Sequence, residues 1–145
     1  MANLLTLPST SVPPALNARV LYDQALLEET VAFCQQELPL VEKEIPAKSQ
    51  KRPSAEAPTS PLYQYYALTA ILTDTLAQLE RWKAAKEVLG RYRVHFPQDP
   101  WGYTVGAEVT RRDPQVKDPE AVQEAIEMLE SEAQRLEGKG KKKAS

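Results

Sequence analysis

The chain has 145 residues, of which 42% are hydrophobic and 26% are charged, and its formal net charge is -2. This size suits one domain with a hydrophobic core, and the charge balance excludes a strong general attraction to nucleic acid. The single cysteine, Cys34, excludes an internal disulfide framework and a cysteine-cluster zinc site, so a soluble protein in a reducing, cytoplasmic location is expected.

Residues 1–14 contain a brief apolar run that Pro8, Pro13 and Pro14 interrupt. A signal peptide has a basic region before its apolar run, and none is present here. The run is also too short for a membrane span, which needs about 20 apolar residues. We therefore expect an extended or disordered arm, which either stays disordered or lies along a partner or along the domain's own groove.

A long helix is predicted over residues 15–45, because apolar side chains recur there at helical spacing. The apolar stripe consists of Leu16, Val20, Leu27, Val31, Cys34 and Leu38. Pro39 interrupts this pattern, so we expect the helix to break or kink near it. The position of Cys34 on the apolar face favours an inert core thiol over a reactive one.

Residues 46–60 are rich in proline and small side chains, and they carry a basic cluster at Lys48, Lys51 and Arg52. Such a composition cannot bury enough apolar surface to offset the entropy of ordering, so a flexible linker is predicted. The cluster is either a set of solvated charges or a weak contact for phosphate or an acidic partner. Ser60 followed by Pro61 is typical of a helix start.

Two helix-period patterns follow the linker. The first consists of Leu62, Tyr65, Leu68, Leu72, Leu76 and Leu79. The second consists of Trp82, Ala85, Val88, Leu89, Tyr92 and Phe96, and it stops before Pro97. Only Glu80 and Arg81 lie between the patterns, which predicts an antiparallel helical hairpin.

The stretch from Tyr66 to Asp99 resembles a tetratricopeptide repeat (TPR), a helix-turn-helix unit of about 34 residues. The matching residues are Leu72 and Leu76 on the large apolar positions of the first helix, Trp82 on the aromatic position after the turn, Ala85 on the small position of the second helix, and Pro97 on the closing proline. Thr73 replaces the usual glycine and Tyr92 the usual alanine, which makes close approach of neighbouring helices there uncertain.

A third helix is predicted after the hairpin, with Asp99 as its cap and Pro100 at its first position. The apolar residues Trp101, Val105 and Val109 lie four apart in it. Gly102 and Gly106 also lie four apart, which is unfavourable in a helix unless another backbone packs closely against them. A loop longer than a regular repeat turn then precedes the last helix.

The last helix begins at Pro119, where Glu120 in the first turn suits the helix dipole. Its apolar face consists of Val122, Ala125, Ile126, Leu129, Ala133 and Leu136. The third and fourth helices resemble the first two, so residues 61–137 are predicted to form one TPR-like domain. Gly138 is expected to end the helix, and 138–145 are expected to form a disordered basic tail.

No catalytic constellation is recognisable in the sequence. His95 is the single histidine, and neither a phosphate-binding loop nor a dinucleotide-binding glycine pattern occurs. No spacing selects a pair of carboxylates for acid–base chemistry. We therefore expect a protein that is not an enzyme and that uses no metal and no cofactor.

The resemblance implies that a partner binds the inner face made by the first helix of each pair. The candidate partner-binding residues are Asp74, Gln78, Trp101, Thr104, Glu108, Arg111 and Arg112, with Ala70 and Ala77 beside them. The adjacent arginines Arg111 and Arg112 are suited to gripping a peptide carboxylate, or are solvated charges at a helix end. Of the aromatic residues, Trp82 and Tyr92 are assigned to the core, and Trp101 and Tyr103 are more open to a partner.

The sequence thus predicts an all-α helical-hairpin array, in which the helix over 15–45 caps two repeats. Its expected role is protein–protein interaction, as an adaptor, assembly factor or accessory subunit of a larger complex. The alternatives are an obligate structural subunit, an enzyme with a cryptic carboxylate site, and a weak nucleic-acid binder that uses the basic linker and tail.

Overall fold

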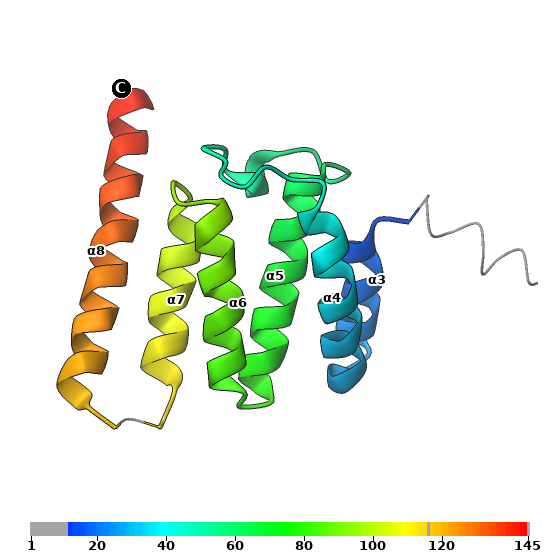
Figure 1. Cartoon of the computed structure of the whole chain (residues 1–145), viewed down its shortest axis with the longest axis horizontal. Helices are drawn as coiled ribbons and strands as arrows, with labels where there is room; N and C mark the ends of the chain where they lie inside the picture. The colour runs from blue at the N-terminus through cyan, green and yellow to red at the C-terminus, as the bar shows by residue number, and fades with distance from the viewer. Residues whose placement is uncertain (1–11, 116, 145) are drawn as a thin grey trace, which may run out of the picture. The chain divides into compact units, whose positions relative to one another are not determined.

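The computed structural model describes the backbone of residues 12–115 and 117–144, and side chains as far as Gly138. The described residues contain six α-helices and no strand, which confirms the predicted all-α fold (Figure 1). The helices are α3 (Pro14–Asp23), α4 (Leu27–Glu42), α5 (Pro61–Gln78), α6 (Trp82–His95), α7 (Pro100–Arg112) and α8 (Pro119–Ala144). None of the described helices is both long and apolar enough to cross a membrane.

The chain forms two compact units. The first consists of the described part of Met1–Ile45 together with Pro53–Thr75, and the second consists of Pro46–Arg52 and the described part of Leu76–Ser145. α5 therefore contributes most of its length to the first unit and its last turn to the second. The TPR-like domain predicted over 61–137 is divided between the two units.

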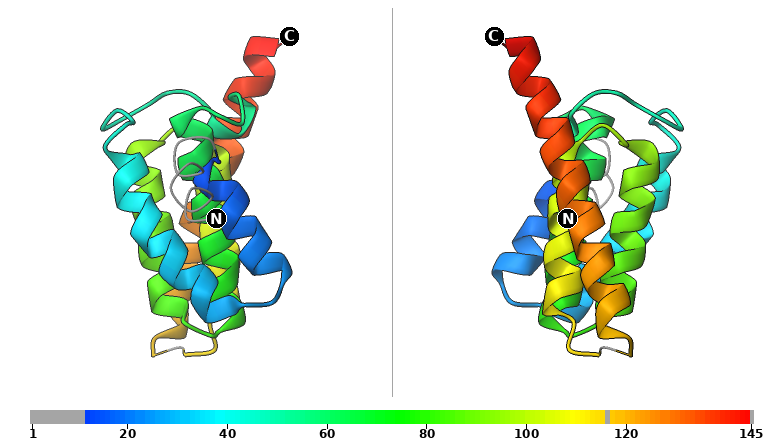
Figure 2. Two further views of the ribbon diagram at one scale, coloured as in Figure 1. Left: turned by 90° about the vertical axis from the view of Figure 1, so that its right-hand side faces the viewer. Right: turned by 90° about the vertical axis from the view of Figure 1, so that its left-hand side faces the viewer.

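The first unit begins with two helices, α3 and α4, which pack against each other (Figure 2). A three-residue turn joins them, in which Ala25 has a left-handed backbone with φ 61°. The N–H of Leu26 donates to the carbonyl of Leu21 at 3.1 Å, and the N–H of Ala25 donates to the carbonyl of Tyr22 at 2.9 Å. This hydrogen-bond pattern closes a helix C-terminus and usually places glycine at the left-handed position.

One helix over 15–45 with a break near Pro39 was predicted, and the predicted position of the break is wrong. The interruption lies at 24–26, and Pro39 lies inside α4. Because α4 ends at Glu42, Pro39 occupies its last turn, where its missing N–H removes only one bond from the helix. The turn at Ala25 was missed because no glycine marks it. The predicted arm over 1–14 lies largely outside the described residues, and Pro14 already begins α3.

The apolar stripe predicted for the long helix is correct for α4 and wrong for α3. Val31 and Cys34 are buried, whereas Leu16 and Val20 are 56% and 47% exposed. The turn resets the phase of the helix, so that Ala15 and Ala18 face the interior instead. Cys34 is completely buried, and burial raises the pKa of its thiol to about 12, as an inert core cysteine requires.

Part of the predicted flexible linker over 46–60 makes specific contacts with the end of α6, within the second unit. The N–H of Ser49 donates to the carbonyl of His95 at 2.7 Å, and the Nδ1 atom of His95 lies 3.1 Å from the carbonyl oxygen of Pro46. A helix C-terminus leaves its last carbonyls without partners inside the helix, which explains why this segment binds there. Lys48, Lys51 and Arg52 are exposed, as expected for solvated charges.

The start of α5 and the turn that follows it agree with the sequence. Ser60 accepts a hydrogen bond from the N–H of Leu62 at 3.2 Å, and Pro61 is the first residue of α5. The turn between α5 and α6 repeats the geometry found after α3. Glu80 is left-handed with φ 59°, and the N–H of Arg81 donates to the carbonyl of Leu76 at 2.8 Å.

In the second unit, α7 lies between α6 and α8 and packs against both (Figure 1). α6 ends before Pro97, and its residues Trp82 and Tyr92 are buried, as predicted. Asp99 caps α7 by accepting the N–H of Trp101 at 3.1 Å. The predicted stop at Gly138 is wrong, because α8 extends to Ala144; lysine is a good helix former, and an exposed glycine costs a helix only about 1 kcal/mol.

Candidate functional site

Groups that could bind a metal ion are the first candidates for a functional site. No group of three His, Cys, Asp or Glu residues within the described part of the chain could hold a metal ion. The ring of His95 contacts a backbone carbonyl. Hollows between helices remain. Two of them are grooves, one in each unit, that combine apolar and cationic lining, and a further hollow of the first unit, of about 490 Å³, is lined by Leu40 and Val41 of α4 and Pro61 of α5.

The groove of the first unit, called the first groove, lies between α3 and α5 and has a volume of about 480 Å³. Its principal side chains are Leu16 and Arg19 from α3 and Tyr63, Tyr66, Ala70 and Ile71 from α5. The rings of Tyr63 and Tyr66 meet edge to face with their centroids 5.9 Å apart. The first groove therefore offers aromatic and aliphatic surface beside one guanidinium group.

Hydrogen bonds fix both ends of α3 against α5. At one end, the side-chain oxygen of Gln64 accepts the N–H of Ala15 at 2.8 Å, while its amide nitrogen donates to the carbonyl of Pro58. At the other end, the hydroxyl of Tyr22 donates to the carboxylate of Asp74. These contacts join the two walls of the first groove at both ends, and such preorganisation favours binding because less order has to be gained.

The sequence-predicted site residues are distributed over both units, with Asp74 in the first and the other six in the second. Asp74 and Gln78 are exposed, and Asp74 is bonded to Tyr22. Thr104 and Glu108 are exposed on α7. Trp101 is half-buried, with its ring 4.9 Å from the ring of Tyr92.

The two adjacent arginines do not act as a pair. Arg111 forms an ion pair with Glu130 of α8 at 2.8 Å, whereas the guanidinium of Arg112 lies 5.4 Å from the ring centre of Trp82 in α6. Neighbouring residues on a helix point about 100° apart, which explains why the two side chains reach opposite neighbours of α7. A joint grip on one carboxylate would require both to leave these partners.

The groove of the second unit, called the second groove, is bounded by α6, α7 and α8 and has a volume of about 460 Å³. Its apolar lining consists of Leu89 from α6 and Ala121, Val122, Ala125, Met128 and Leu129 from α8. Leu89 is fully buried, and Met128 is 70% exposed. Two cationic residues of α6, Lys86 and Arg93, also line it.

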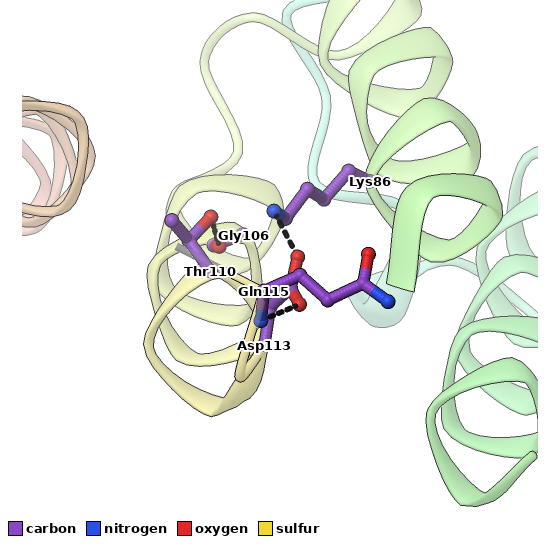
Figure 3. Close-up of polar contacts among 5 residues, drawn as sticks. All are labelled: Lys86, Gly106, Thr110, Asp113 and Gln115. Carbon is purple, nitrogen blue, oxygen red and sulfur yellow. Dashed lines mark hydrogen bonds and ion pairs between the residues drawn. The ribbon is translucent and has the colours of Figure 1, made fainter. Parts of the chain in front are cut away.

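Lys86 is neutralised within the chain. Its ammonium group contacts the carboxylate of Asp113 at 2.7 Å, and this carboxylate also accepts the N–H of Gln115 at 2.9 Å (Figure 3). The hydrogen bond from Lys86 lowers the pKa of Asp113 below its ordinary value. Beside this pair, the hydroxyl of Thr110 donates to the carbonyl of Gly106 at 2.7 Å, as Figure 3 shows.

Arg93 lies across α7, over the two glycines that the sequence singled out. A Cβ atom at Gly106 would stand 2.5 Å from Nη1 of Arg93, and one at Gly102 would stand 3.0 Å from Cγ of Arg93 and from the ring of Tyr92. The expected close approach at these glycines is thus real, but the approaching group is a pair of side chains rather than another backbone.

Comparison of the chain with protein-family models, with curated proteins and with solved structures gives no match. The class of protein is therefore defined by its own geometry, as an all-α chain whose two units each carry an open, partly apolar groove.

Sequence reasoning located some groove residues and missed others. Ala70, on the predicted inner face, lines the first groove together with Tyr63 and Tyr66, which were not among the candidate residues. Leu16 was assigned to the core, because the turn at Ala25 that turns it outwards leaves no signal. Arg93 was not selected, although the spacing of Gly102 and Gly106 indicated that something crosses α7 there.

Proposed function

We propose that this chain is a non-catalytic protein–protein interaction module, a cytoplasmic adaptor, assembly factor or accessory subunit that binds a polypeptide segment of another protein. The observation that carries the proposal is the first groove, whose walls are joined by hydrogen bonds at both ends while Leu16 remains 56% exposed. Tyr63 and Tyr66 add rigid contact area, and aromatic rings of this kind anchor protein interfaces at low entropy cost.

A TPR-like architecture is part of the proposal, and the repeated turn supports it. After each turn, the fourth residue of the next segment is small and fully buried, namely Thr30 in α4 and Ala85 in α6. The N–H of each donates to the carbonyl of the last turn residue, Leu26 or Arg81, at 2.9 and 3.1 Å. Ala85 is the residue that the resemblance places on the small helix-two position, and Thr30 is its counterpart.

The lining of the first groove defines the chemistry of its occupant. Leu16 and Ile71 favour an apolar side chain. The guanidinium of Arg19 pairs through Nε with Asp23 at 3.1 Å, and its side chain is 63% exposed, so its remaining N–H groups are the donors that it offers to an acceptor of the occupant. An amphipathic or extended peptide segment satisfies both requirements, because such segments bind grooves through spaced apolar anchors.

The proposal is tested by affinity capture with the wild-type chain, followed by measurement of the dissociation constant for the purified partner. Leu16→Glu places a charge in the first groove, and Val94→Glu is the matched control, because Val94 is 60% exposed on α6 and lines neither groove. We expect the Leu16 variant to lose the partner and the Val94 variant to keep it. An Arg111→Ala/Arg112→Ala variant tests the predicted site on α7 in the same experiment.

If Leu16→Glu keeps the partner with unchanged affinity and unchanged helical circular dichroism, the first groove is not the binding surface. If the arginine variant alone loses the partner, the interface lies on α7. If no partner is captured by any folded variant, the interaction module proposal fails and screening for enzymatic turnover takes its place.

An obligate structural subunit is the second candidate, and the exposed apolar side chains favour it. Leu16, Leu40, Val94 and Met128 are between 52% and 70% exposed. A subunit that buries such residues permanently should be unstable or aggregated alone. A monomeric, cooperatively unfolding chain in light scattering and thermal melts would exclude this candidate.

A further inference from the structure

The second groove contains a half-buried charge that the chain itself does not balance. Arg93 donates from Nη1 to the carbonyl of Gly102 at 3.0 Å, and its guanidinium lies 5.8 Å from the ring centre of Tyr103. A guanidinium has five N–H donors, and this one contacts no carboxylate among the described residues. Burial lowers the pKa of Arg93, which reports the cost of holding its charge away from water.

No hidden carboxylate side chain accounts for this charge. Residues 1–11, Val116 and 139–145, whose side chains are not described, include neither aspartate nor glutamate. Other cations of the second unit do have carboxylate partners: Lys86 pairs with Asp113, Arg111 with Glu130, and Arg135 with Glu132. Arg93 differs from these residues in being both more enclosed and without an acidic partner.

The sequence also accommodates Arg93 at a local cost. Each glycine inside a helix costs about 1 kcal/mol relative to alanine. α7 carries Gly102 and Gly106 on one face, and a side chain at Gly106 would occupy the place of the guanidinium. Two glycines, which are unfavourable in a helix of 13 residues, therefore leave the space that the Arg93 side chain occupies over α7.

Arg93 lies beside the accessible apolar part of the second groove. A Cβ atom at Gly106 would stand 2.5 Å from Nη1 of Arg93 and 3.6 Å from Cδ1 of Leu129, so the two side chains approach the same point of α7. Leu129 and Val122 of α8 are partly exposed, unlike the fully buried Leu89, and they form the apolar surface next to the guanidinium. A ligand that fits both groups carries an apolar side chain and a carboxylate about one helical turn apart.

We propose that the second groove binds an acidic amphipathic helix of a partner protein, with an aspartate or glutamate side chain on Arg93 and an apolar side chain one turn away against Leu129. The carboxylate supplies the charge that the chain lacks, and a guanidinium binds a carboxylate through two parallel hydrogen bonds. The apolar contact follows the usual way in which a helix binds a groove. This inference does not depend on the first groove and can stand if that site fails.

The test uses a blocked, alanine-based helical peptide with one Glu and one Leu four residues apart, and the same peptide with Gln in place of Glu. Binding to the full chain is followed by NMR, with ¹³C-methyl methionine as the probe. The chain has two methionines, Met1 and Met128, and Met128 lines the second groove. The Nε–H signal of Arg93 reports the guanidinium directly.

We expect the Glu peptide to shift both signals with a saturable binding curve, and the Gln peptide to bind at least about tenfold more weakly, as a charged hydrogen bond in a partly dry site implies. Arg93→Met, which keeps the aliphatic stem, should abolish the difference between the peptides. Lys83→Met, an exposed cation on the same helix, is the control and should preserve it.

A second variant tests the position of the guanidinium without removing Arg93. Gly106→Ala leaves the arginine in the chain but displaces its guanidinium, because the new methyl would lie 2.5 Å from Nη1. Since the end of a flexible side chain moves easily, the variant should fold normally and bind the Glu peptide at least about tenfold more weakly.

Three results would overturn the proposal. Equal binding of the Glu and Gln peptides would show that the groove recognises apolar surface alone. Equal shifts of the Arg93 signal with inorganic phosphate would make it a general anion site. The absence of any saturable shift at Met128, in a chain with an intact spectrum, would show that no helix of this chemistry binds there.

Discussion

Asp99 provides the sharpest test of how the second unit is held together. Its side chain is 2% exposed and makes two separate hydrogen bonds, because Oδ1 accepts the N–H of Trp101 at 3.1 Å and Oδ2 accepts the hydroxyl of the fully buried Tyr92. One carboxylate thus caps α7 and satisfies a buried phenol of α6.

Asp99→Ala removes both contacts. Loss of the cap costs about 1 kcal/mol, and leaving a buried hydroxyl without a partner costs about 1–3 kcal/mol, so the free energy of unfolding should fall by about 2–4 kcal/mol. The corresponding fall in Tm is roughly 10 °C for a chain of this size. Asp99→Asn retains a capping oxygen and should lose less than half as much.

The assay is urea unfolding, monitored by tryptophan fluorescence and circular dichroism. It is applied to a double-mutant cycle that combines Asp99→Ala with Tyr92→Phe. Since the double variant Asp99→Ala/Tyr92→Phe leaves no unpaired hydroxyl, it should be more stable than the sum of the single effects implies, by about 1 kcal/mol or more. A loss below about 0.5 kcal/mol for Asp99→Ala, or strict additivity of the two substitutions, would refute the reasoning.

Three further outcomes are expected. The pKa of Asp113 is lowered mainly by its hydrogen bond with Lys86. The stability that this carboxylate contributes is therefore fully present above about pH 4, its pKa in the unfolded chain, and is lost as the pH falls through its lower pKa in the folded chain. Lys86→Met should weaken this loss of stability at acid pH, as measured by urea unfolding at several pH values. Cys34 should resist iodoacetamide at neutral pH until the chain unfolds, as mass spectrometry of labelled protein would reveal, and fast labelling of the folded chain would contradict its burial. Ala25→Gly should raise Tm by a few degrees, because Ala25 is held at φ 61° and glycine adopts this conformation without strain, whereas Ala18→Gly, inside α3, should lower it.

Local signals in the sequence were sufficient for most helix ends. Ser60 with Pro61, Asp99 with Pro100, and Pro97 after α6 each mark a boundary that the structure confirms. Caps and prolines act on the backbone within one turn, so their effect does not depend on the rest of the fold. The all-α class followed from the same local patterns.

The missed features depend on contacts that sequence patterns do not carry. The turn at Ala25 is closed by main-chain hydrogen bonds, and alanine there gives no warning of a left-handed residue. This one omission put Leu16 and Val20 in the core, although both are exposed. Arg93 was missed for a related reason: its partly enclosed position results from two glycines on another helix.

None of the seven candidate partner-binding residues lines either groove, so the binding face proposed from sequence stays a prediction. Ala70 lines the first groove, but Arg111 and Arg112 contact α8 and α6 separately. The resemblance gives the helix on which a residue stands, whereas the direction of a long side chain depends on the partner that it finds across the helix interface.

The contact between Ser49 and the end of α6 has a consequence for how this chain can be divided. Because Pro46–Arg52 belongs to the second unit while the residues on both sides of it belong to the first, the chain passes between the units after Ile45, after Arg52 and again after Thr75. The two units are interleaved along the sequence. No single cut yields two complete fragments, since a fragment that begins at α6 lacks the segment whose Ser49 N–H donates to the carbonyl of His95. Studies of the isolated second unit therefore require a permuted or two-piece chain in which 46–52 is supplied.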